Sequence, residues 1–166
     1  MRDMQREYKW DNLKGFLILL VVIGHFTESF LADSHLYKSL WLCIYSFHMP
    51  LFFLVAGYFH RNQNIGRKLY FYISLSLLTG ILIFVCAKLA GRNPSLKYLE
   101  VSSLPWFMLS MASFVGLAYL VRNIDAFFVL GIAFVVGFFS GYDGQIGDML
   151  ALSRTRVFFP FYMVGI

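Results

Sequence analysis

Four ionisable residues lie on one arc of the first apolar stretch of the sequence. Lys14 and His25 differ by eleven positions, which on an α-helix is three turns plus about 20° and about 16 Å along the axis. Asp11 precedes Lys14 by three positions and Glu28 follows His25 by three, so all four fall within about 100° if one helix includes them. Because a charge that faces lipid is costly, this stripe is expected to face a protein interior or a water-filled cavity.

The residue types on this arc suit general acid–base chemistry. Imidazole takes and releases protons near neutral pH, so His25 is the predicted base for a hydroxyl group. Glu28, one helical turn away, is the predicted partner that orients the ring, whereas Asp11 lies about 20 Å from His25 and is expected to fix Lys14. The predicted catalytic residues are therefore His25, Glu28 and Asp11. The alternative is that Asp11, Lys14 and Glu28 only mark the two membrane interfaces.

The second apolar stretch contains a histidine and ends at a cationic loop. Pro50 removes a backbone hydrogen bond and is expected to kink the segment, and His48 lies two residues before it, where carbonyl groups without a donor gather. Arg61, Arg67 and Lys68 follow the segment; they can hold phosphate groups or serve as a plain positive-inside anchor. His35 and His60, at segment ends, are expected to be solvated. The predicted substrate-binding residues are Lys14, His48, Arg61, Arg67, Lys68 and Trp106.

The elements that carry these residues are predicted to be membrane helices. The chain of 166 residues is 59% hydrophobic and only 14% charged, with a mean hydropathy of +0.67. These values exclude an ordinary soluble domain, and they indicate an all-α fold, a polytopic transmembrane bundle of five to six helices in a single domain. The expected segments are residues 13–31, 39–59, 69–90, 104–121, 126–141 and 157–166.

The distribution of charge predicts how the bundle lies in the membrane. Three basic residues precede the first segment, and Arg61, Arg67 and Lys68 follow the second without an acidic residue beside them. The connection between the two segments carries one lysine against two acidic residues. The positive-inside rule therefore predicts a multi-pass protein of the plasma (inner) membrane with a cytoplasmic N-terminus, and no nucleic-acid partner is expected despite the net charge of +5. No metal or permanently bound cofactor is expected, because Cys43 and Cys86 lie singly in apolar stretches.

Four stretches of the sequence resemble one family. DNLKG followed by VVIGH, and then SFHMPLFFLVAGYF, are similar to the opening of the integral-membrane acyltransferase family (the acyltransferase-3 group), especially its fucose 4-O-acetylase-like branch. SSLPWFML at 102–109 and FFPFYMVG at 158–165 resemble later segments of that branch. All matches fall in the N-terminal half of the family, whose members usually have nearly twice as many helices. The resemblance therefore implies an incomplete family fold, with further helices from missing chain or an oligomer as partners.

The resemblance also implies a reaction: transfer of an acetyl group from cytoplasmic acetyl-CoA, the donor, to a sugar hydroxyl of a cell-surface or secreted glycan. In the family a basic residue, usually arginine, precedes the catalytic histidine with ten residues between them; Lys14 and His25 hold these places here. Lysine keeps the charge of arginine but lacks its bidentate fork, so a point-charge role is expected. The family's paired arginines after the second helix have no equally spaced counterpart here. Trp106 is assigned to the acyl channel or, alternatively, to an interfacial aromatic belt.

Two readings from other classes stay open at this stage. In the first, Lys14 and His25 form the proton or anion path of a transporter or flippase-like module. In the second, the chain is a truncated, non-catalytic membrane anchor that is inactive alone. Within the acyltransferase reading, a covalent acetyl-histidine intermediate is an alternative to general-base catalysis. The acceptor and the acyl group do not follow from the sequence.

Overall fold

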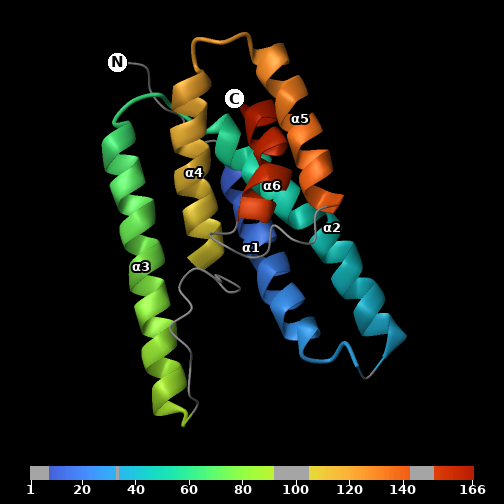
Figure 1. Ribbon diagram of the computed structural model, residues 1–166. Coiled ribbons are helices and arrows are strands. Elements are labelled where there is room, and N and C mark those ends of the chain that lie inside the picture. The colour runs from blue at the N-terminus through green and yellow to red at the C-terminus, as the bar shows by residue number, and fades with distance from the viewer. Residues whose placement is uncertain (1–7, 33, 92–104, 143–151) are drawn as a thin grey trace.

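The computed structural model of the chain describes residues 8–32, 34–91, 105–142 and 152–166. All regular secondary structure in these residues is α-helical, which confirms the predicted all-α fold. Figure 1 shows the helices arranged as a bundle. They are α1 (Tyr8–Glu28), α2 (His35–Tyr58), α3 (Ile65–Leu89), α4 (Pro105–Val121), α5 (Ala126–Tyr142) and α6 (Leu152–Gly165).

Three of the helices are long and apolar enough to cross a membrane. These are α1, α2 and α3, with 21, 24 and 25 residues, and at a rise of about 1.5 Å per residue each reaches the thickness of the hydrocarbon layer, about 30 Å. Helices α4 and α5 are also apolar but shorter. The length and composition of α1, α2 and α3 indicate a membrane protein.

Helices α2 and α6 occupy the centre of the bundle. Helix α2 packs against α1 and α6, helix α6 also packs against α4 and α5, and α3 packs against α4. The core lies where α2, α4 and α6 meet: the Phe53 and Phe114 rings are 4.9 Å apart, and the Phe114 and Tyr162 rings are 5.2 Å apart. A hydrogen bond of 3.0 Å between Ser110 and Thr155 joins α4 to α6 inside the bundle. Packing and interhelical hydrogen bonds are what hold helices together in lipid, where apolar side chains gain nothing by leaving solvent.

Several helices begin earlier than the apolar runs predict, whereas α1 ends at Glu28 rather than near residue 31. Helix α1 begins at Tyr8 rather than near residue 13, α3 begins at Ile65 rather than near 69, and α6 begins at Leu152 rather than near 157. The reason is that hydropathy marks residues that suit hydrocarbon, whereas a helix needs only its backbone hydrogen bonds and continues into the polar boundary. At the start of α2, Ser34 caps the helix, because its Oγ accepts a hydrogen bond of 3.2 Å from the Leu36 N–H.

Pro50 does not interrupt its helix. Helix α2 runs unbroken from His35 to Tyr58 with Pro50 inside it. Proline lacks the N–H that would bond the Ser46 carbonyl, but neighbouring helices can support such a site.

Candidate functional site

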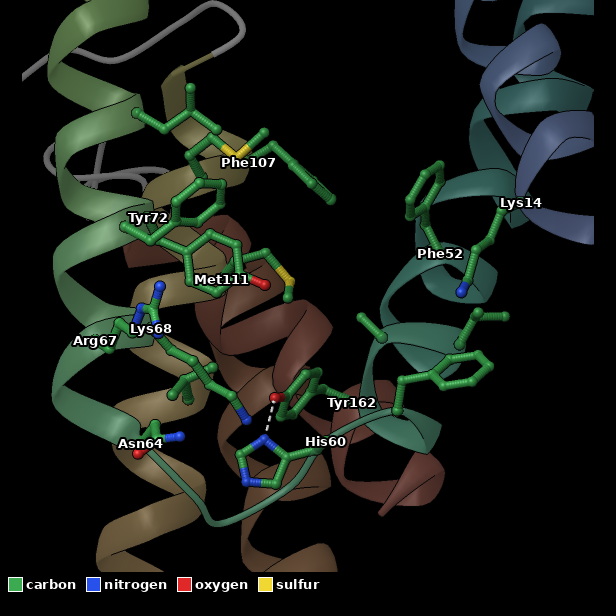
Figure 2. A pocket seen from close by; sticks show the side chains of 17 residues that line it. Lys14, Phe52, His60, Asn64, Arg67, Lys68, Tyr72, Phe107, Met111 and Tyr162 are labelled. Carbon is green, nitrogen blue, oxygen red and sulfur yellow. Dashed lines mark hydrogen bonds between the residues drawn. The ribbon is translucent and has the colours of Figure 1, made fainter. Parts of the chain in front are cut away.

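A cavity of about 600 Å³ lies between α1, α2, α3, α4 and α6. Figure 2 shows Lys14 of α1 entering from one side and Arg67 and Lys68 of α3 from the other. Aromatic and aliphatic side chains form the rest of the wall. The cavity therefore combines a cationic part with an apolar part, which suits a ligand that has an anionic group and a less polar arm. The apolar lining includes Phe52, Val55, Phe71, Phe107, Met111 and Val115.

Lys14 is held at this cavity by an aromatic ring. Its Nζ lies 3.8 Å from the centroid of the Phe59 ring, which is a close cation–π contact, and both residues line the cavity. Phe59 in turn meets Trp10 edge to face at 5.7 Å, and Trp10 stacks on Tyr58 at 4.4 Å. The ammonium is therefore fixed by residues at the end of α2 rather than moving freely in solvent.

The other cations of the cavity lie in the first turn of α3, directly after the loop from α2. Asn64 adopts a left-handed conformation (φ 53°) just before α3, and its side chain does not cap the helix. Lys68 Nζ donates a hydrogen bond to the Arg61 carbonyl, which ties the first turn of α3 to the loop. Arg67 and Lys68 line the cavity, whereas the exposed Arg61 side chain does not. The amino end of α3 thus adds its positive dipole to two side-chain cations.

His60 also lines the cavity, and its expected solvation is wrong. The half-buried ring has a partner on each nitrogen: Nδ1 lies 2.6 Å from the Tyr162 hydroxyl, and Nε2 lies 2.9 Å from Asn62 Oδ1. Nε2–H donates to the amide oxygen, so Nδ1 accepts from the tyrosine hydroxyl. Tyr162 is buried, at 1% exposure. The sequence carries no local signal for this pair, because Tyr162 is 102 positions away.

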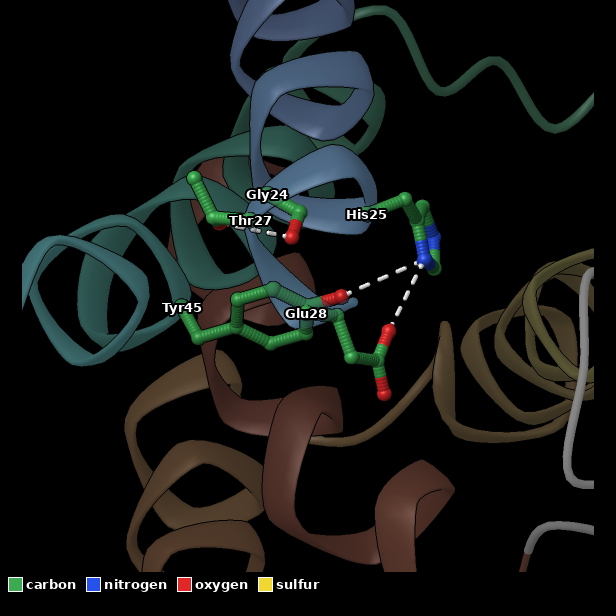
Figure 3. A network of polar contacts seen from close by, with 5 residues as sticks. All are labelled: Gly24, His25, Thr27, Glu28 and Tyr45. Atoms are coloured by element: carbon green, nitrogen blue, oxygen red, sulfur yellow. Dashed lines mark hydrogen bonds and ion pairs between the residues drawn. The ribbon is translucent and has the colours of Figure 1, made fainter. Parts of the chain in front are cut away.

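His25 lies towards the other end of α1, away from the cavity. A single helix includes Asp11, Lys14, His25 and Glu28, which confirms the geometric premise of the stripe. His25 Nδ1 lies 3.3 Å from Glu28 Oε2 and 3.4 Å from the Tyr45 hydroxyl (Figure 3). Since a carboxylate only accepts, Nδ1 carries the proton and Nε2 holds the lone pair. Nε2 has no hydrogen bond to any of the described residues, and the side chain is 59% exposed.

Tyr45 reaches His25 because α1 and α2 approach closely at Gly24. A side chain on Gly24 would place its Cβ 2.9 Å from the edge of the Tyr45 ring. Thr27 Oγ1 donates to the Gly24 carbonyl at 2.9 Å and keeps this polar side chain satisfied at the contact. Sequence reasoning missed Tyr45, although glycine directly before the histidine marks a place where another helix can come close.

Comparison with known proteins gives the chain a family. The model of a family described as an acyltransferase domain matches residues 7–166. The chain belongs to this acyltransferase family. It is similar to the nodulation protein NolL of Sinorhizobium fredii (strain NBRC 101917 / NGR234), with 39% identity over 56 residues, which are 32% of the chain and 15% of that protein.

A second relative has the same printed name and is matched over a similarly short part. The nodulation protein NolL of Mesorhizobium japonicum (strain LMG 29417 / CECT 9101 / MAFF 303099) is 33% identical over 66 residues, 38% of the chain and 18% of that protein. The match thus spans less than a fifth of each of these relatives. No solved structure matches the chain significantly.

In this member of the acyltransferase family, the remaining predicted substrate-binding residues, His48 and Trp106, lie outside the cavity. His48 is buried, and its Nδ1 donates to the Ile44 carbonyl at 2.7 Å. That carbonyl is not the one that Pro50 leaves without a donor. Trp106 packs beside the core cluster, with the Arg154 guanidinium 5.1 Å from its ring centroid. Neither residue is among those that line the cavity.

Proposed function

We propose that the protein is a membrane O-acyltransferase that moves an acetyl group from acetyl-CoA to a sugar hydroxyl of a cell-surface or secreted glycan. Membership of the acyltransferase family supports the reaction class. The observation that carries the proposal is on α1, where one helix places Lys14 at a cationic cavity and His25 at its other end, with an Nε2 that no described residue bonds.

The cavity is the proposed donor site. Acetyl-CoA has phosphates at one end and a thioester at the end of a long arm, so its binding site needs separated cationic and reactive parts. Lys14, Arg67 and Lys68 offer three cations for the phosphates, and the apolar wall suits the arm. Along α1, Lys14 and His25 are about 16 Å apart, which is a separation that only a long donor can span.

His25 is the proposed general base. Its Nε2 takes the proton of the acceptor hydroxyl while the oxygen attacks the thioester carbonyl, and Glu28 on Nδ1 holds the tautomer and stabilises the imidazolium. The tetrahedral intermediate then expels coenzyme A as a thiolate, which takes the proton back from His25. The products are an acetyl ester and free coenzyme A, so each bond and proton is accounted for. Asp11, in the first turn of α1, supports the Lys14 end.

The orientation required is the one that the loop charges predict. With a cytoplasmic N-terminus in the inner membrane, the Lys14 end of α1 and the amino end of α3 face the cytoplasm, where acetyl-CoA is made. His25 then lies towards the outer side, where a glycan acceptor would arrive. Acetyl-CoA as diffusible donor, a glycan as acceptor and the bilayer as solvent are the partners of this proposal.

Acetyl transfer by the reconstituted protein tests the proposal. Radioactive acetyl-CoA is offered with cell-surface oligosaccharides, and both labelled ester and free thiol are measured. His25→Ala is expected to lower transfer by about 10²- to 10⁴-fold, which is the usual contribution of a general base. His35→Ala is the matched control, since His35 is the exposed first residue of α2. Equal transfer by both variants contradicts the mechanism, and movement of solute without thioester cleavage favours a transporter.

A further inference from the structure

Two aromatic side chains of α2 lie beside the proposed base and have no part in the mechanism above. Trp41 and Tyr45 are one helical turn apart, and their rings stack with centroids 4.4 Å apart and an interplanar angle of 26°. Tyr45 meets the His25 ring edge to face at 6.2 Å, in addition to its hydroxyl contact. Both aromatic side chains are half-buried, so each keeps an exposed part. They form a ladder of rings that ends at the imidazole.

This ladder has hydrogen-bonding groups that the described residues do not use fully. The Trp41 Nε1–H is covered by protein atoms and lies on the side chain that stacks on Tyr45, so the polar group that the ladder can offer to a ligand is the Tyr45 hydroxyl. Because His25 Nδ1 directs its proton towards Glu28, it cannot accept from the Tyr45 hydroxyl, whose own proton stays available for another acceptor. The Tyr45 hydroxyl is carried by a half-buried ring beside His25, so its free proton is a donor that the oxygen of a polar ligand can use.

We infer that Trp41 and Tyr45 are the platform on which the sugar ring of the acceptor stacks. A pyranose presents a face of C–H groups, which packs on aromatic rings, and a rim of hydroxyls, which bonds to donors and carboxylates. Trp41 and Tyr45 offer the rings, and Glu28 offers a carboxylate that would repel the donor's phosphates. This inference rests on the proposed function, because it brings a sugar hydroxyl to His25 Nε2.

The plain alternative is that Trp41 belongs to an interfacial aromatic belt. A belt residue needs lipid headgroups around it and no contact with a catalytic histidine. Here Trp41 stacks on Tyr45, and Tyr45 meets the His25 ring edge to face. Gly24 allows Tyr45 this position, since its missing side chain leaves room for the Tyr45 ring edge.

Saturation-transfer NMR on the whole chain tests the platform. The protein is held in a detergent that has no sugar headgroup, and the probes are methyl β-glucopyranoside and sorbitol, which has hydroxyls but no ring face. We expect saturation transfer to the C–H groups of the glycoside only. Trp41→Leu should weaken its binding roughly three- to ten-fold, which is the worth of an aromatic contact. Phe47→Leu, on an exposed part of the same helix, is the matched control and should leave binding unchanged.

Acetyl-CoA binding by the same samples separates this inference from the proposed function. Loss of the sugar signal in Trp41→Leu with unchanged acetyl-CoA binding supports the platform, and Trp41→Phe, which preserves a ring at the site, should retain more of the signal. No sugar signal in the wild type, or an equal signal in Trp41→Leu, overturns the platform even if acetyl-CoA binds. If the wild type fails to bind acetyl-CoA, the proposed donor is wrong. A sugar signal that depends on Trp41 would still support the platform in that case.

Discussion

The three described histidines that have side-chain contacts differ in which ring nitrogens are occupied, and this difference selects the base. His60 has a partner on both nitrogens, so it has no lone pair to offer. His48 is buried and bonded to the backbone of its own helix. His25 has partners only on Nδ1 among the described residues and is largely exposed. A general base needs a lone pair that can reach a substrate, and of these three only His25 meets that requirement.

The first residue-scale prediction concerns the carboxylate that orients this base. Glu28→Gln keeps the size of the side chain but removes its charge, so the amide no longer selects the Nδ1–H tautomer or stabilises an imidazolium. We expect kcat for acetyl transfer to fall about 10²-fold with little change in the KM for acetyl-CoA. Initial rates at varied acetyl-CoA measure both constants. A large rise in KM with unchanged kcat would place Glu28 in donor binding instead.

The second residue-scale prediction concerns the ring that holds Lys14. Phe59→Leu preserves apolar volume but removes the cation–π contact of 3.8 Å, so the ammonium loses its fixed position at the cavity. The Kd for acetyl-CoA should rise about two- to ten-fold, from a contact worth about 0.5–1.5 kcal/mol. Calorimetry in detergent measures the change. Phe59→Tyr retains an aromatic face and should bind acetyl-CoA nearly as the wild type does; equal binding by Phe59→Leu contradicts this role.

At the scale of elements, the contact between α2 and α6 positions the cavity wall. Gly57 of α2 lies against the Tyr162 carbonyl, and Gly165 of α6 lies against the Leu54 carbonyl, so neither glycine has room for a side chain. Such small residues let two helices approach closely, and close approach is the main source of packing energy in lipid. The same contact brings Tyr162 within reach of His60. The positions of side chains at the cavity therefore depend on a crossing that two glycines make possible.

The prediction at this scale is that Gly57→Ala separates α2 from α6. Its methyl group would overlap the Tyr162 backbone, which cannot turn aside as a side chain can, so overpacking should cost about 1–3 kcal/mol. The melting temperature in detergent should fall by several degrees, and acetyl-CoA binding should weaken as the cavity wall moves. Gly131→Ala in α5 is the control, because nothing lies within 4 Å of its added Cβ. A melting temperature equal to that of the control variant contradicts the close crossing.

At the scale of the whole molecule, apolar runs predict well where the helices lie in the sequence. They do not predict which side chains of different helices contact each other. The stripe from Asp11 to Glu28 follows from helical periodicity alone, because all its residues share one helix. The His60–Tyr162 hydrogen bond and the Tyr45–His25 contact join different helices, and periodicity says nothing about which faces meet. The cavity is harder still, since five helices contribute to its wall. The catalytic and binding roles of the chosen residues stay predictions.

Orientation decides whether the cationic cavity can meet its donor. The loop charges predict that the connection before α3 lies in the cytoplasm and that the connection between α1 and α2 lies outside. In a variant with Cys43→Ser and Cys86→Ser, single cysteines at two exposed loop positions, Ala32→Cys and Gln63→Cys, report the two sides separately. An impermeant maleimide on intact cells should label Ala32→Cys at once and Gln63→Cys only after permeabilisation. The opposite pattern would turn Lys14, Arg67 and Lys68 away from cytoplasmic acetyl-CoA, and the cavity could then not be its site.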